Sequence, residues 1–121
     1  MIAEIREVIR LLVRERGEMS FAVLIQTTKE TRGDCLGPRK PMQIVFWRGL
    51  SHEACGAIRQ LTGAGELYLE PCSTSIYLRD GIALCLPIAH GLRVYQTPTW
   101  LPVVLCRGSV PRRPRHGWVA I

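Results

Sequence analysis

The apolar residues change their spacing at Gly65, and this change limits the folds that the chain can adopt. Before Gly65, residues 2–16 and 51–62 carry apolar side chains at helical spacing. After it, short apolar segments follow one another, separated by proline, glycine and Asp-Gly turn signals. Helices segregated from strands in this way predict an α+β fold. We expect two or three helices in the first half, then a mainly antiparallel sheet of about five strands.

Two of the helices are predicted directly from their stripes and their ends. In residues 2–16 the apolar residues recur on one face, and Gly17 follows the last of them. A second helix begins at Ser51, which can cap it, and runs to about Thr62 before Gly63. Its inner stripe is Ala54, Ile58 and Leu61.

The segment 20–28 fits either a helix or a strand. Ser20 can cap a short helix that contains the apolar run Phe21–Ile25. The β-branched residues of the same segment favour a strand instead. Periodicity does not separate the two for so short a run.

The remaining strands are predicted from turn residues. Residues 29–41 form a loop, and 42–47 a short buried strand. Further strands are expected at 66–70, 75–79, 82–88, 92–96 and 100–106, with Asp80-Gly81 as a two-residue hairpin turn. Pro87, Pro98 and Pro102 must lie at edges or bends, because proline has no N–H for a ladder. We therefore divide the chain into one globular domain, 1–107, and a Pro/Gly/Arg-rich tail, 108–121.

The net charge of +6 is concentrated in the last 21 residues, 101–121. Residues 1–50 carry nine Lys/Arg and six Asp/Glu, residues 51–100 carry three and four, and residues 101–121 carry four and none. The three parts thus contribute +3, −1 and +4. Arginine suits phosphate and carboxylate recognition, although an arginine-rich composition can equally follow from the base composition of the coding DNA.

The cysteines predict no metal site and no disulfide framework. The five of them are odd in number and match no zinc or thioredoxin spacing, so we expect a reducing, cytoplasmic setting. Cys55, Cys85 and Cys106 lie within apolar patterns and are expected to act as small hydrophobes. Cys35 lies among basic residues, which favour a thiolate, but no histidine is close in sequence, and we interpret it as an ordinary loop cysteine. The longest uncharged stretch, 94–106, is too short to span a membrane.

One stretch resembles a known superfamily. The segment Leu50–Ala54, continuing through Ile58–Leu61 to the turn Leu61-Thr62-Gly63-Ala64-Gly65-Glu66-Leu67, is similar to the end of a winged helix-turn-helix recognition helix. The resemblance covers residues 2–80 at most. It implies that strands 67–69 and 76–78 form the wing hairpin and that the helix from Ser51 faces DNA. The loop and strand between the second and third helices depart from the superfamily pattern.

The resemblance and the charge together suggest a role without catalysis. Arg59 and Gln60 are the donors on the outer face of the helix from Ser51, and Arg112, Arg113 and Arg115 supply the charge of the tail. We expect a small accessory or regulatory protein, not an enzyme, that is associated with nucleic acid through these five residues. No paired carboxylates, triad order or cofactor loop predicts catalysis, and no cofactor is expected.

A second class of function stays open. Strands within Leu92–Cys106 carry few charges, and a free apolar edge is an aggregation hazard unless a partner covers it. The alternative is therefore an interaction or assembly module, with the chain itself as one partner. Trp47 and Trp100 are predicted to be structural. The apolar end Trp118–Ile121 either folds back onto the sheet, provides a docking peptide or is a frayed terminus.

Overall fold

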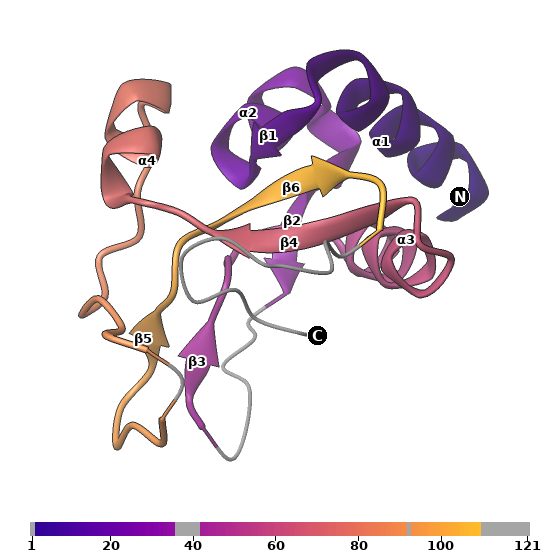
Figure 1. Cartoon of the computed structure of the whole chain (residues 1–121). Coiled ribbons are helices and arrows are strands. Elements are labelled where there is room, and N and C mark those ends of the chain that lie inside the picture. The colour runs from indigo at the N-terminus through magenta and orange to yellow at the C-terminus, as the bar shows by residue number, and fades with distance from the viewer. Residues whose placement is uncertain (1, 36–41, 92, 110–121) are drawn as a thin grey trace.

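The computed structural model describes residues 2–35, 42–91 and 93–109. In chain order the elements are α1 (Ile2–Arg16), β1 (Glu18–Ser20), α2 (Phe21–Thr27), the 3-10 helix η1 (Lys29–Thr31), β2 (Arg32–Cys35), β3 (Ile44–Val45), α3 (His52–Gly63), β4 (Leu67–Pro71), α4 (Thr74–Asp80), β5 (Thr99–Trp100) and β6 (Val103–Arg107). The fold is α+β, and most of its helices precede most of its strands, as predicted (Figure 1).

A three-stranded antiparallel sheet in the order β1-β6-β4 crosses the middle of the molecule. In the central strand, Leu105 lies opposite Met19 of β1 on one side and opposite Leu69 of β4 on the other. β3 and β5 form a separate parallel pair. Within the described residues the antiparallel sheet is therefore smaller than the expected five strands. Because β6 is paired along both edges, it offers no free edge for the strand association that we expected from Leu92–Cys106.

Helices α1 and α3 form where local signals predicted them. Ser51 caps α3, and its Oγ accepts a hydrogen bond from the N–H of Ala54 at 3.1 Å. Within residues 20–28, Phe21–Thr27 form the helix α2, and the Oγ of Ser20 accepts from the N–H of Val23 and caps it. The capping hydroxyl thus outweighs the strand preference of the β-branched residues.

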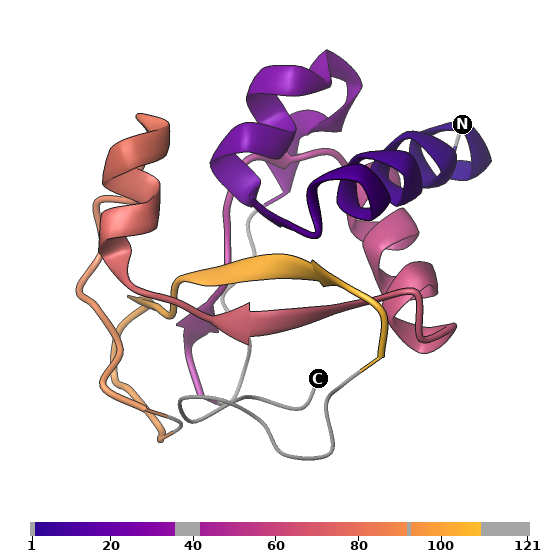
Figure 2. The ribbon, with the colours of Figure 1, turned by 45° about the horizontal axis from the view of Figure 1, so that its top comes forward.

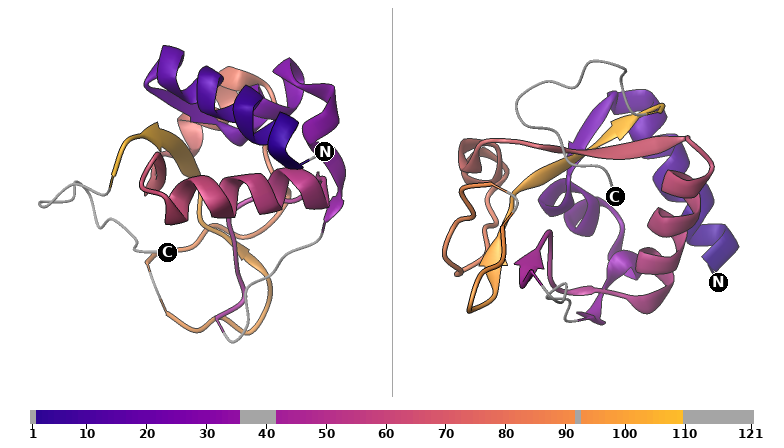
Figure 3. Two further views of the ribbon diagram at one scale, coloured as in Figure 1. Left: turned by 90° about the vertical axis from the view of Figure 1, so that its right-hand side faces the viewer. Right: turned by 60° about the horizontal axis from the view of Figure 1, so that its bottom comes forward.

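Helices α1 and α3 pack against each other and against one face of the sheet. Figure 3 shows α1 lying across α3, and Figure 2 shows α1 and α2 on the same side of β6. At Gly56 a Cβ atom would lie 3.3 Å from the Cδ1 of Ile2, so the small residue allows this close approach. The core contains Ile5, Ile9, Val13, Met19, Ala54, Ala57, Ile58, Leu61, Leu67, Leu69, Val103 and Leu105.

Residues 75–79 are helical, so the predicted wing strand 76–78 and the Asp80-Gly81 hairpin are both wrong. The N–H of Ser75 donates to the Oγ of Ser73 at the start of α4. At its end Gly81 takes a left-handed conformation with φ of 91°, and its N–H donates to the carbonyl of Tyr77. Glycine at positive φ serves a helix end as well as a hairpin turn. The strand that pairs with β4 is β6 instead.

The expected strands at 82–88 and 92–96 are also absent among the described residues of those segments. An isolated bridge joins Ile88 to Trp100, and the N–H of Ala89 donates to the carbonyl of Trp100. The expected strand 100–106 is interrupted, since Leu101 and Pro102 separate β5 from β6. Proline cannot donate to a ladder, so the strand breaks at that residue.

Aromatic rings bring the segment after β3, helix α4 and strand β5 into the hydrophobic core. The ring of Trp47, in the segment after β3, stacks on Tyr77 of α4 with centroids 5.2 Å apart. Tyr77 in turn meets Trp100 of β5 edge to face at 5.0 Å. Trp47 and Trp100 are buried, which confirms their structural role. They are consequently unavailable as platforms on which nucleic-acid bases could stack.

Candidate functional site

The outer face of α3 carries the two globular-domain residues that the sequence singled out. Ala54, Ala57, Ile58 and Leu61 are buried, and this inward stripe turns Arg59 and Gln60 outward, where both are exposed. His52 is exposed at the start of the same helix. The side-chain donors Arg59 and Gln60 therefore lie near the last turns of α3, away from its N-terminus.

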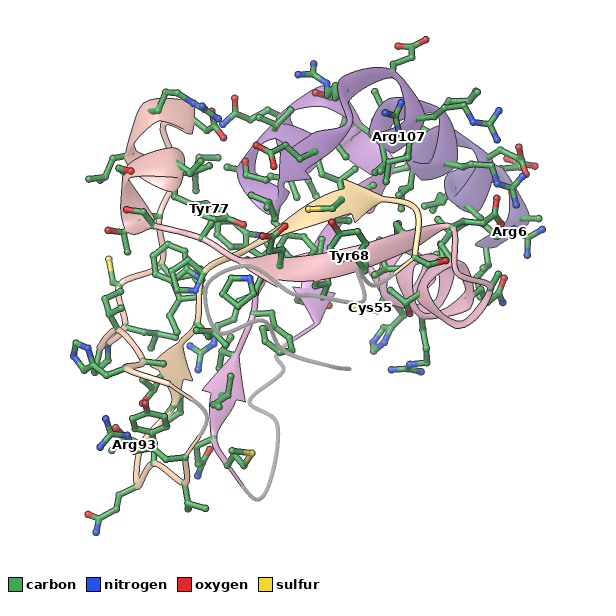
Figure 4. The ribbon with its side chains drawn as sticks, in the orientation of Figure 1. Arg6, Cys55, Tyr68, Tyr77, Arg93 and Arg107 are labelled. Atoms are coloured by element: carbon green, nitrogen blue, oxygen red, sulfur yellow. The ribbon has the colours of Figure 1, made fainter. Side chains whose placement is uncertain are left out.

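Gln60 is held by a residue that sequence reasoning did not select. Nη1 of Arg6, on α1, donates to Oε1 of Gln60 at 2.5 Å. The bond leaves the amide group of Gln60 as a donor and brings a second guanidinium beside α3. Figure 4 shows Arg6 at the end of the molecule where α1 and α3 lie together. These two residues are 54 positions apart in sequence, and no local pattern links them.

Arg10 of α1 and Arg59 of α3 differ in how far their charge is neutralised. Arg10 forms ion pairs with Glu7 and with Glu66, the latter at 2.9 Å. The hydrogen bond to Glu66 raises the pKa of the Arg10 guanidinium, an effect that partial burial opposes. Within the described residues no carboxylate lies within ion-pair distance of Arg59. Arg59 is thus a cation available to a ligand, whereas Arg10 is occupied within the fold.

A further basic group lies where β6 ends beside α1. Nη1 of Arg107, labelled in Figure 4, donates to the backbone carbonyl of Arg14 at 2.9 Å. The side chains of both residues are exposed. This hydrogen bond to a neutral carbonyl leaves the guanidinium charge of Arg107 uncompensated. On or beside α1 and α3, Arg6, Arg59 and Arg107 thus form no ion pair with a described carboxylate, and the same holds for the exposed Arg14.

The geometry suits contact with phosphates better than the reading of bases. A recognition helix reads base edges mainly with residues of its N-terminal part. Here the first turn of α3 presents His52 and the half-buried Glu53, while Arg59 and Gln60 come later. Guanidinium groups and an amide at separate points of a surface can bind successive phosphates without specifying a sequence.

Several predicted residues cannot be placed on this surface. Arg112, Arg113 and Arg115 lie outside the described residues, as do Leu92 and Trp118. Cys35 is the last residue of β2, and its side chain is likewise not among those that the structure describes. Cys85 was expected within an apolar pattern but is exposed, because residues 82–88 form no strand that could cover it.

The described residues contain no group of three potential metal ligands. Nor does any helix among residues 2–35, 42–91 and 93–109 have the length and apolar character needed to cross a membrane. Comparisons with models of protein families, with curated proteins and with solved structures find no match to this chain. Any assignment of function must accordingly come from the geometry.

Proposed function

We propose that this protein is a winged-helix-like accessory protein that binds nucleic acid through phosphate contacts on its α1–α3 side. One observation carries the proposal: the chain order of the elements and the order of the sheet. Leaving aside the segments 28–51 and 72–102, the described elements run α1, β1, α2, α3, β4, β6, with the sheet order β1-β6-β4. This is the order of a winged helix, in which the third helix is the nucleic-acid-facing one.

The two segments left aside are long additions to that arrangement. The segment between α2 and α3 holds β2 and β3, and the segment between β4 and β6 holds α4 and β5. They pair with each other through β3 and β5, for example Val45 opposite Trp100. In this interpretation residues 72–102 occupy the place of the wing and are folded into the domain.

The charges support the same surface. Arg6, Arg59 and Arg107 are cationic, Gln60 is a hydrogen-bond donor, and the tail would add Arg112, Arg113 and Arg115 as further phosphate contacts. The alternative role as an assembly module depended on a free strand edge in Leu92–Cys106, and β6 is paired on both sides. The arginines and Gln60 favour nucleic acid as the partner that we propose.

The test measures binding of a fluorescently labelled DNA duplex by anisotropy at about 50 and 200 mM salt. Arg59→Gln and Arg6→Gln should each weaken binding equally for unrelated sequences and lower the salt slope by about one. Arg93→Gln is the matched control, because Arg93 is an exposed arginine at the opposite end of the molecule (Figure 4). Absence of salt-dependent binding, or an equal loss in the Arg93 variant, would refute the proposed surface.

A further inference from the structure

The sheet has a second face, opposite the one on which α1 and α3 pack. Side chains alternate between faces along a strand, and Leu67, Leu69, Val103 and Leu105 belong to the core. The intervening residues of the three strands therefore share the other face. The register places them in two rows, Glu18–Cys106–Tyr68 and Ser20–Val104–Glu70.

Much of this second face is buried, although Glu18 is exposed and Tyr68 half-buried. Val104 is 5% exposed and Cys106 is 4% exposed, and neither belongs to the core cluster that contains their neighbours Val103 and Leu105. Glu70, which lies opposite Val104 in the sheet, is 6% exposed. Such burial on an outward sheet face requires a covering segment.

The same face is acidic. Burial, together with the charges of Glu18, Glu70 and Asp80, raises the pKa of the Cys72 thiol to about 12. Burial and the charges of Glu70 and Glu18 likewise raise the pKa of Cys106 to about 12. The Sγ of Cys106 donates to Oε2 of Glu70 at 3.6 Å. A covering segment that carries positive charge would offset this concentration of carboxylates.

The chain beyond β6 begins at the edge of this face. The N–H of Gly108 donates to the carbonyl of Glu66, and the Oγ of Ser109 donates to the carbonyl of Gly65. The last described residue, Ser109, therefore lies beside the start of β4. Fully extended, residues 110–121 reach roughly 40 Å, more than twice the length of a five-residue strand. They carry three arginines, then Trp118, Val119 and Ile121, and no acidic residue.

We propose that residues 110–121 dock in cis on the face formed by Glu18, Ser20, Tyr68, Glu70, Val104 and Cys106. The arginines face the carboxylates, and the apolar end Trp118–Ile121 covers Val104 and Cys106. This inference does not depend on nucleic-acid binding. If both proposals hold, the face competes with nucleic acid for the arginines of the tail.

The first experiment measures alkylation rates of individual cysteines in the full chain by peptide mass mapping. Trp118→Ala leaves the formal charge unchanged, so a faster reaction reports loss of the cover, which both exposes the thiol and removes the burial that raises its pKa. Cys106 should react at least about fivefold faster in this variant, as expected for loss of a local cover. Val94→Ala, at a 68% exposed apolar residue outside this face, is the matched control.

Three results would overturn the proposal. An unchanged Cys106 rate means that another part of the molecule covers the face. A parallel rise at Cys55, which lies on α3, means that Trp118→Ala loosens the whole fold. Protection of Cys106 that is lost when the wild-type chain is diluted identifies a second copy as the cover.

The second experiment tests the charge pairing by limited trypsin digestion of the full chain. Docking should slow cleavage after Arg112 and Arg115. Glu18→Gln, at an exposed residue of this face, should speed that cleavage severalfold, whereas Glu15→Gln, at an exposed residue of α1, should not. Equal cleavage rates in the two variants would remove the acidic face as the docking site.

Discussion

Tyr77 has more structural roles than any other single side chain described above. Its hydroxyl donates to the carbonyl of Val103 at 2.5 Å and accepts from the N–H of Phe21 at 3.2 Å. Its ring contacts both Trp47 and Trp100. Burial is the main reason that its pKa is raised well above the ordinary value. The residue connects α2, α4 and β6 through one buried hydroxyl.

We expect Tyr77→Phe to lower the free energy of unfolding by about 1–3 kcal/mol, because it leaves a buried N–H and a buried carbonyl without this partner. Urea unfolding followed by circular dichroism measures the change. Tyr95→Phe is the matched control: its hydroxyl also bonds two backbone groups, those of His90 and Gly91, but these are exposed. The prediction fails if both variants lose equal stability.

The carboxyl of Asp80 makes the stability of the fold depend on pH. Burial alone would raise its pKa, but hydrogen bonds from Arg79 and Ser20, with the charges of Arg79 and Arg16, outweigh burial and lower it. A carboxyl whose pKa is lower in the folded state contributes stability above its unfolded pKa of about 3.9. That contribution is lost as the pH falls through the folded pKa.

We therefore expect Asp80→Asn to flatten the acid side of the stability profile. Urea unfolding at several pH values between about 2 and 7 should show a smaller loss below about pH 4 than in the wild type. Glu15→Gln removes an exposed carboxyl for comparison. An Asp80→Asn profile that runs parallel to the wild-type profile throughout would contradict the assignment.

At the scale of the elements, the residues that cap or end the helices determine the secondary structure more than the strand preferences of single residues do. Ser20, Ser51 and Ser73 each cap a helix through the side-chain oxygen. At Gly33 the constraint is steric, because a Cβ atom there would lie 2.5 Å from the Cα of Ser51. Strand β2 can therefore pass the start of α3 only with glycine at that position.

Gly81→Val tests the end of α4. The site is sterically open, but its φ of 91° is unfavourable for any side chain and most of all for a β-branched one. We expect a loss of about 1–3 kcal/mol in the free energy of unfolding, the range for strained backbone. Gly63→Ala, where φ is ordinary and no atom lies within 4 Å of the added carbon, should not destabilise. A melting temperature of the Gly81 variant equal to that of the wild type would contradict the helix end.

At the scale of the molecule, the charge is divided between a domain and a tail. Ending the chain after Ser109 removes Arg112, Arg113 and Arg115 and takes the formal charge from +6 to +3. We expect the domain to remain folded, because its core residues all precede residue 106. If the tail contacts phosphates, the salt slope of nucleic-acid binding should fall by about 3.

Anisotropy of a labelled duplex at several salt concentrations measures that slope, and circular dichroism monitors the fold. Salt-steep binding that survives truncation would assign the contacts to Arg6, Arg59 and Arg107. Truncation should also speed alkylation of Cys106, since it removes the segment that we propose as its cover. A slow Cys106 in the truncated chain would count against the docking proposal and leave the nucleic-acid proposal unaffected.

The candidate site was predictable only in part. Arg59 and Gln60 followed from the helical stripe, because the position of the buried residues determines which residues face outward. Arg6 did not, since its place beside Gln60 depends on how α1 crosses α3. The acidic second face was not predictable either. It arises only when β1, β4 and β6 align, and β6 lies more than 30 residues after β4 in the chain.

By itself the sequence determined the α+β class, the helices α1 and α3, the cap of α3 and the structural role of Trp47 and Trp100. These depend on interactions between residues a few positions apart and on the burial of large apolar rings. The tertiary structure alone decided that residues 74–80 are a helix, that β4 pairs with β6, and that β6 is central in its sheet. Strand pairing depends on partners distant in sequence, and a glycine at positive φ ends a helix or turns a hairpin equally well. The local preference of Asp80-Gly81 is thus the same for a helix end and for a hairpin turn. The packing of Tyr77 against Trp47 and Trp100 favours the helix.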